Sequence, residues 1–225
     1  MARIIFDLDG TLVESAPSLT AAANALLGEL GREPLSEGTT RTFVGHGVKV
    51  LVERVLSHTG GIPGGDSAPH LERFRAIYNA DPVTGTEPIA GVPVALAALA
   101  AAGHGLGVCT QKPNLPAVAI LKALGLMPPV TALTDGDSLA VMKPDPRMLD
   151  HAAAQLPEGP VLFVGDSEVD AATAEAARVP FLLYTEGYRG QPVEALRHAA
   201  AFSDFAALPG LVETLLAHAC GEVSI

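Results

Sequence analysis

The sequence is short of basic residues, and this shortage excludes two classes of partner. Lys and Arg number 14 against 25 Asp and Glu, which gives a net charge of −11. Because binding to nucleic acid or to an anionic membrane surface requires a basic face, we expect neither as a partner. Charged residues of both signs make up only 17% of the chain and hydrophobic residues 48%, so the composition predicts a large core and argues against disorder.

Cysteine is also scarce, and no hydrophobic run marks a targeting segment. Cys109 and Cys220 fit neither a metal-ligand spacing nor a disulfide framework, which suits a reducing compartment. Asp7 comes too early for the apolar region of a signal peptide. The apolar run of residues 92–109 is mostly Ala and Gly and is interrupted by a proline and a histidine, so a helix and a strand explain it better than a membrane span. We therefore expect a soluble, cytoplasmic protein.

Two acids close to the N-terminus are the most informative residues that are present. The apolar run of residues 4–6 has the character of a buried strand, and Asp7 and Asp9 follow it before Gly10 breaks the pattern. Aspartate is depleted in strands and costly to bury unpaired. In parallel sheets, ligands bind at the carboxyl ends of the strands. Paired acids at this position therefore indicate a Mg²⁺ site, a nucleophile, or both.

The remaining pattern predicts two parts with different architectures. From about residue 14 to residue 84 the periodicity is only helical, with helices expected at residues 16–30, 40–59 and 68–79. Strands and helices then alternate, with strands expected at residues 106–110, 130–133, 161–165 and 181–184 and helices at residues 93–102, 115–124, 145–155 and 169–177. This alternation is typical of a doubly wound, Rossmann-like parallel sheet. We therefore expect an α/β core, residues 1–13 and 85–225, with a small α-helical cap, residues 14–84, inserted after the first strand.

Three further polar clusters lie at the ends of predicted strands or before a helix. They are Thr110-Gln111-Lys112, Lys143-Pro144-Asp145-Pro146, and Gly165-Asp166-Ser167 with Asp170. Each cluster alone has a structural explanation: a capped strand end, a solvated lysine, a helix cap, or an acid in a first helical turn. The first two acids alone would also suit an acidic pocket of the response-regulator type or a helix-capping cluster. The case for function depends on their joint occurrence.

Together the clusters supply what hydrolysis of a phosphate ester requires. A carboxylate such as Asp7 can attack phosphorus and form an aspartyl-phosphate, and Asp9 can act as general acid and then general base. Asp7 and Asp166 offer the oxygen ligands that Mg²⁺ prefers. Lys143, the Thr110 hydroxyl and the backbone N–H groups after Asp7 can stabilise the charge on the phosphoryl oxygens.

The four clusters, in this order, resemble those of the phosphatases of the haloacid dehalogenase superfamily. The resemblance implies that Asp7 is the nucleophile and that Asp9 is the acid/base, with its backbone carbonyl on Mg²⁺. It also implies that Asp166 ligates the metal and that Asp170 orients Lys143 or a metal-bound water. The phosphate-binding set would be Leu8, Gly10, Thr110, Gln111 and Lys143. The helical insertion resembles the small cap of this superfamily.

A narrower resemblance extends over residues 4–188. Residues 109–113, 135–138 with 143–146, and 44–48 are similar to bacterial phosphoglycolate phosphatases, although Gln111 stands where that family usually has Asn. This similarity implies Mg²⁺-dependent hydrolysis of 2-phosphoglycolate to glycolate and phosphate through an aspartyl-phosphate. The alternatives are a related phosphatase, a phosphoglucomutase-like phosphotransferase acting on a sugar phosphate, or a non-catalytic module that binds a phosphorylated metabolite.

A two-carbon phosphorylated acid also needs a partner for its carboxylate. The cap offers Arg41, Lys49 and the backbone N–H groups of residues 45–47 as candidates. The alternative for the two side chains is that they are ordinary solvated cations on a helix face. We expect a small phosphorylated substrate and a monomer or homodimer.

Overall fold

The strand that leads to the first two acids lies at the centre of the sheet. β1, Arg3–Phe6, turns Ile4 and Phe6 to one face and Ile5 to the other, and all three side chains are fully buried. Apolar side chains on both faces are typical of a parallel strand that is covered by helices on each side.

Six parallel strands form the main sheet, in the order β5–β4–β1–β6–β7–β8. The other strands of this sheet are β4 (Gly105–Cys109), β5 (Ala132–Thr134), β6 (Val161–Gly165), β7 (Phe181–Tyr184) and β8 (Ala200–Phe202). The structure is a computed structural model that describes the backbone of residues 1–221 and the side chains as far as residue 218, so the Cys220 side chain lies outside the described residues. The expected doubly wound α/β sheet is confirmed.

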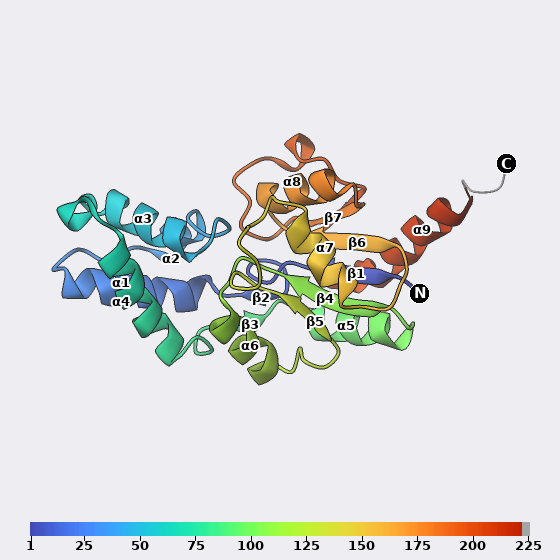
Figure 1. The fold of residues 1–225 in the computed structure, drawn as a ribbon, viewed down its shortest axis with the longest axis horizontal. Helices are drawn as coiled ribbons and strands as arrows, with labels where there is room; N and C mark the ends of the chain where they lie inside the picture. The colour runs from blue at the N-terminus through green and yellow to red at the C-terminus, as the bar shows by residue number, and fades with distance from the viewer. Residues whose placement is uncertain (222–225) are drawn as a thin grey trace.

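Helices cover both faces of this sheet (Figure 1). The apolar side chains of α5, α6 and α9 pack on the face that carries Ile4 and Phe6, and those of α7 and α8 pack on the face that carries Ile5. These helices are α5 (Val92–Ala101), α6 (Asn114–Ala123), α7 (Arg147–Ala154), α8 (Glu168–Ala177) and α9 (Leu208–Gly221). Over residues 1–221, no helix combines the length and the apolar character that crossing a membrane would need.

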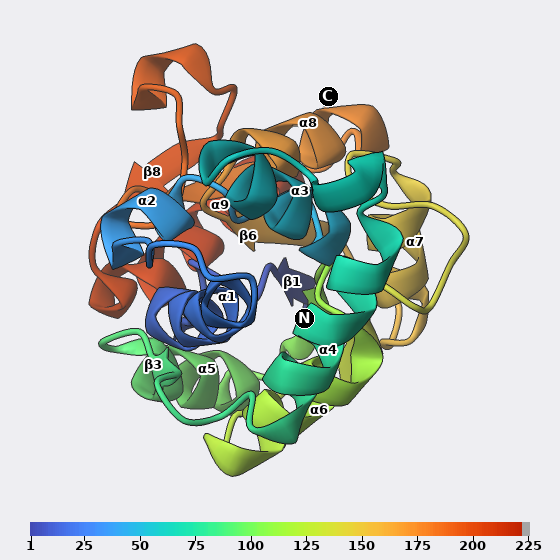
Figure 2. The same ribbon diagram turned by 90° about the vertical axis from the view of Figure 1, so that its left-hand side faces the viewer.

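Four helices between β1 and α5 lie together at one end of the molecule (Figures 1 and 2). They are α1 (Ala16–Glu29), α2 (Glu37–Arg41), α3 (Val48–His58) and α4 (Ala68–Ala80). The buried apolar side chains of α1, α3 and α4 form a cluster separate from the two clusters of the sheet. All four lie within the predicted cap, residues 14–84, whose status as a separate domain stays a prediction.

A short antiparallel pair joins the two ends of this helical segment. β2 (Val13–Glu14) pairs with β3 (Glu87–Pro88), where the chain leaves the sheet and where it returns. This pair and β8 were not among the expected elements, because runs of two or three residues carry too little periodicity to be recognised. The 14-residue helix α9 was also not among the expected elements.

One expected helix is wrong. Residues 40–59 do not form a single helix, because α2 ends at Arg41 and α3 begins at Val48. Gly45 and Gly47 between them have φ values of 105° and 84°, which a helix cannot accommodate and which glycine adopts readily. The chain therefore turns here, and residues 42–47 form a loop.

Candidate active site

Three neighbouring strands deliver polar side chains to one edge of the sheet. Asp7 follows β1, Thr110 follows β4 and Asp166 follows β6, and β1 pairs in parallel with both of the other strands. The carboxyl ends of parallel strands meet at one edge, where ligands bind in α/β proteins. The structure thus brings together three of the residues that the motifs singled out.

Lys143 connects two of the buried acids. Its Nζ lies 2.8 Å from Asp7 Oδ1 and 2.6 Å from Asp170 Oδ1, and its side chain is 3% exposed. The other oxygen of Asp170 accepts hydrogen bonds from the N–H and hydroxyl of Ser167, whose Oγ accepts one from the Asp170 N–H. This is the capping box of α8, so Ser167 and not Asp166 caps the helix. Asp170 is therefore both a capping residue and a partner of Lys143.

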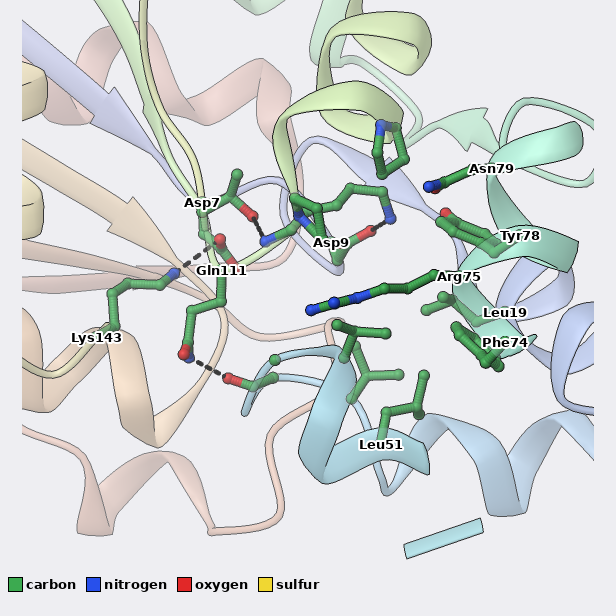
Figure 3. A pocket seen from close by; sticks show the side chains of 18 residues that line it. Asp7, Asp9, Leu19, Leu51, Phe74, Arg75, Tyr78, Asn79, Gln111 and Lys143 are labelled. Carbon is green, nitrogen blue, oxygen red and sulfur yellow. Dashed lines mark hydrogen bonds and ion pairs between the residues drawn. The ribbon is translucent and has the colours of Figure 1, made fainter. Parts of the chain in front are cut away.

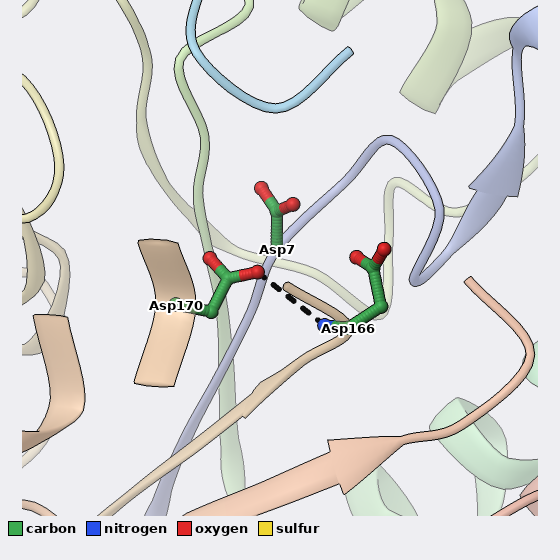
Figure 4. A group of neighbouring side chains, drawn as sticks. All are labelled: Asp7, Asp166 and Asp170. Atoms are coloured by element: carbon green, nitrogen blue, oxygen red, sulfur yellow. Dashed lines mark hydrogen bonds between the residues drawn. The ribbon is translucent and has the colours of Figure 1, made fainter. Parts of the chain in front are cut away.

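Three acids, which Figure 4 shows beside one another, share a single lysine in this cluster, so negative charge exceeds positive charge. Asp7, Asp166 and Asp170 each offer an oxygen within 4.8 Å of the others. Burial raises the pKa of Asp7 to about 7, against the opposing charge of Lys143. Burial, with the charges of Asp170 and Asp7, also raises the pKa of Asp166 well above its usual range. Burial alone would lower the pKa of Lys143, but Asp170 and Asp7 raise it, so the ammonium stays charged.

The donor set fits a divalent cation such as Mg²⁺. With all three acids ionised, their charge exceeds the single positive charge of Lys143 by two, which a divalent cation would balance. Asp170 Oδ2 already accepts two hydrogen bonds from Ser167, and Asp170 Oδ1 faces the Lys143 ammonium, whose charge disfavours a second cation at that oxygen. Asp7 and Asp166 are therefore the favoured carboxylate ligands. Mg²⁺ commonly takes one or two carboxylates and completes its octahedron with water and phosphate.

The surroundings of Asp166 include a residue that sequence reasoning missed. Asp166 Oδ1 accepts a hydrogen bond from the Thr11 hydroxyl at 2.7 Å, and Oδ2 accepts one from the Tyr188 N–H at 2.6 Å. A carboxylate oxygen has two lone pairs, so each still has one for a metal. Gly10 has a φ of 88°, and a Cβ there would lie 2.6 Å from Asp166 Oδ2, so only glycine fits. Tyr188 belongs to the loop after β7, and no local pattern marks it.

Asp9, the predicted acid/base, is held by two donors. Its Oδ1 accepts hydrogen bonds from the Ser15 hydroxyl at 2.6 Å and from Lys112 Nζ at 2.8 Å. Lys112 Nζ also lies 4.8 Å from the centre of the Tyr78 ring, which comes from α4 in the helical segment. Lys112 belongs to a sequence motif that gave it no role; in the structure it connects Asp9 to the helical segment.

A pocket opens between the edge of the sheet and the helical segment (Figure 3). The sheet side contributes Asp7, Asp9, Thr110, Gln111, Lys112 and Lys143. The facing wall comes from α1, α3, α4 and the loop of residues 42–47. Gln111 joins the two walls, because its Nε2 donates a hydrogen bond to the Gly45 carbonyl at 2.7 Å. The candidate nucleophile and the candidate acid/base thus face a single pocket.

Two predicted phosphate-binding residues lie outside the lining of this pocket. The Leu8 side chain is fully buried, and Gly10 lies against Asp166. The Gly10 N–H donates to the Val13 carbonyl at 2.8 Å, so this donor is engaged within the loop after β1. The Leu8 N–H donates no hydrogen bond within residues 1–221 and is available to a ligand. Phosphate binding by either residue stays a prediction.

The two cations named as candidates for the substrate carboxylate also lie outside the lining. Arg41 Nη2 pairs with Glu14 Oε2 at 2.7 Å, and the guanidinium lies 4.9 Å from the centre of the Tyr188 ring. Lys49 Nζ is 3.7 Å from Glu53 Oε1, and its side chain is 68% exposed. Of the three candidates, only the loop of residues 45–47 reaches the pocket, through Gly45 and Gly47.

Comparisons with known proteins agree with this geometry. The family model of the haloacid dehalogenase-like hydrolases matches residues 4–184. The chain is 47% identical over 218 residues to a phosphoglycolate phosphatase of Cereibacter sphaeroides, covering 96% of this chain and 100% of that protein. It is 42% identical to a phosphoglycolate phosphatase of Rhodobacter capsulatus, covering 93% and 96%. The crystal structure of a predicted phosphoglycolate phosphatase from Haemophilus somnus superimposes with a TM-score of 0.86 at 29% identity, covering 93% and 96%.

Proposed function

Because the chain belongs to the haloacid dehalogenase-like hydrolases, we propose that it is a phosphatase that hydrolyses 2-phosphoglycolate to glycolate and phosphate. The observation that carries the proposal is that Asp7 and Asp9 face one pocket together with Thr110 and Lys143. The names of the relatives at 47% and 42% identity support the choice of substrate. We also propose that the reaction takes place in the cytoplasm and that no nucleic acid is a partner, because a net charge of −11 disfavours binding of a polyanion.

In the first step, one carboxylate oxygen of Asp7 attacks phosphorus and the bond from phosphorus to the glycolate oxygen breaks. Asp9 gives its proton to the departing oxygen, which leaves as the hydroxyl of glycolate. Lys143 holds Asp7 Oδ1 at 2.8 Å, which fixes the orientation of the nucleophile before the substrate arrives. An aspartyl-phosphate on Asp7 is the product of this step.

In the second step, a water molecule attacks the phosphorus of the aspartyl-phosphate. Asp9, now ionised, accepts a proton from that water, and the bond between phosphorus and Asp7 breaks to release phosphate. The Ser15 hydroxyl and Lys112 hold Asp9 Oδ1, so the same carboxylate is positioned for both proton transfers. Thr110, Gln111 and Lys143 supply hydrogen-bond donors for the phosphoryl oxygens.

Asp7, Asp166 and the backbone carbonyl of Asp9 would hold Mg²⁺. Bound there, the ion neutralises the excess charge of the buried acids and lets a phosphate dianion enter the cluster. Asp170 Oδ1 accepts a hydrogen bond from Lys143 Nζ at 2.6 Å and so positions this lysine. We do not propose Asp170 as a metal ligand. The helical segment, residues 14–84, acts as a cap that covers the pocket and excludes bulk water during the reaction.

A hydrolysis screen tests the proposal. Purified protein is assayed against 2-phosphoglycolate, other phosphorylated acids and sugar phosphates, with Mg²⁺ and with EDTA. We expect the highest kcat/KM with 2-phosphoglycolate and no turnover with EDTA. A preference for sugar phosphates, or isomerisation of a sugar phosphate that depends on a bisphosphate, would contradict the proposed substrate.

A further inference from the structure

Arg75 is a cation on the wall of the pocket that α4 forms. Phe74, Arg75, Tyr78 and Asn79 all line the pocket, as their spacing of three to four residues on a helix allows. Figure 3 shows Arg75 extended from α4 into the pocket, with its guanidinium on the side where Gln111 lies. Arg75 was not among the candidates from sequence, because nothing in the pattern of α4 distinguishes it from Arg73.

The three cations that line the pocket differ in their partners. Lys143 bonds two buried acids, and Lys112 bonds Asp9 and lies over an aromatic ring. Within the described part of the chain, the one partner of Arg75 is Glu72, through Nη1 at 2.9 Å, and the side chains of this pair are 41% and 70% exposed. The catalytic acids thus engage both lysines and leave Arg75 to interact with something else.

We propose that Arg75 binds the carboxylate of the substrate and thereby gives the enzyme its preference for phosphorylated acids over neutral phosphate esters. This inference rests on the proposed function, which supplies a substrate with a carboxylate at one end and a phosphate at the other. With Asp7 taking the phosphate end, the carboxylate points away from the sheet, toward the wall that α4 provides. Asn79, one turn further along α4, adds an amide donor to the same wall.

The chemistry of arginine suits this role. A guanidinium has five N–H donors in a planar fork and binds a carboxylate with two parallel hydrogen bonds. The contact with Glu72 uses Nη1, so Nη2 and Nε remain for a ligand. A pair between exposed residues is weak, so Arg75 loses little when it turns toward a substrate.

The test is to replace Arg75 and compare two substrates of similar size. The first is 2-phosphoglycolate, and the second is 2-hydroxyethyl phosphate, which carries a hydroxymethyl group in place of the carboxylate. For Arg75→Gln we expect kcat/KM for 2-phosphoglycolate to fall about 10- to 100-fold, the range for hydrogen bonds between charged groups. We expect kcat/KM for 2-hydroxyethyl phosphate to change less than about threefold. Arg75→Lys, which keeps the charge and loses the fork, should fall between wild type and Arg75→Gln.

A matched control is available on the same helix. Arg73 pairs with Glu29 on the outside of the helical segment and does not line the pocket, so Arg73→Gln should keep the kinetics of wild type with both substrates. An Arg75→Gln variant that keeps the wild-type ratio of kcat/KM between acidic and neutral esters overturns the inference. Failure of the proposed function is distinguishable, because wild type itself would then prefer another ester to 2-phosphoglycolate. The ratio of kcat/KM between acidic and neutral esters in Arg75→Gln would still show whether Arg75 binds a carboxylate.

Discussion

The two walls of the pocket hold their charges in opposite ways. On the sheet side, Lys143 lies between Asp7 and Asp170 at 2.8 and 2.6 Å, with 3% of its side chain exposed. On the side of α4, the Arg75 side chain is 41% exposed and pairs with Glu72, which is itself exposed. Groups that react must be held in place before the substrate binds, because reorganisation during the reaction raises the barrier. Groups that recognise a substrate can instead exchange one exposed partner for another. Arg75 is such a group, because its partner Glu72 is exposed.

The largest effect should follow from removing the nucleophile. Asp7→Asn takes away the attacking carboxylate, so we expect kcat to fall by at least ~10⁴-fold. The variant should fold, because it replaces a buried acid whose pKa is raised by burial with a neutral side chain of the same shape. Steady-state kinetics and a thermal melt measure the two quantities. Asp150→Asn, an exposed position on α7, serves as the control with full activity. Comparable turnover by Asp7→Asn would remove Asp7 from the mechanism.

The next prediction compares how much each wall contributes to the free energy of unfolding. Lys143→Met leaves two buried carboxylates without their cation and should lower the free energy of unfolding by about 3–5 kcal/mol. Arg75→Gln removes an exposed pair and should change it by less than about 1 kcal/mol. Urea unfolding of both variants in EDTA measures the difference. Equal losses would mean that the sheet wall is not more tightly constrained than the wall formed by α4.

Asp7, on the sheet wall, should make the stability of the protein depend on pH. The pKa of Asp7 is raised to about 7 by burial, whereas an unfolded aspartate titrates near 3.8. Between these values the folded protein keeps a proton that the unfolded chain has released, so its stability falls as the pH rises. The slope is at most about 1.4 kcal/mol per pH unit for one group.

Urea unfolding at several pH values in EDTA tests this dependence. Subtracting the curve of Asp7→Asn from that of wild type removes the contribution of other titrating groups. We expect the difference to fall from pH 5 to pH 7. A difference that stays flat over this range would mean that Asp7 is already ionised in the folded protein at pH 5.

The two walls also differ in how far the sequence predicts them. Asp7, Thr110 and Asp166 each follow a predicted strand, and a parallel sheet brings such positions to one edge. Arg75 and Tyr78 enter the pocket because α4 packs against α1 and α3 in a particular orientation, which a single chain does not encode locally. Tyr188 was missed because only the tertiary fold brings the loop after β7 to Asp166. The break at Gly45 and Gly47 was missed because the helical spacing of the apolar residues from Val48 to Leu56 was extended back across the two glycines to Thr40.

The smallest expected effect lies on the wall of α4, at Asn79. Its side chain lines the pocket and makes no hydrogen bond to any residue of the described part of the chain, so it is available to a ligand. A hydrogen bond between neutral groups contributes about 0.5–1.5 kcal/mol, so Asn79→Ala should lower kcat/KM for 2-phosphoglycolate about 2- to 12-fold. The effect should appear in KM and leave kcat nearly unchanged, because the group binds the substrate equally before and during the reaction. A loss confined to kcat would instead place Asn79 among the groups that act on the reacting phosphate, and the division between a reacting wall and a recognising wall would not hold.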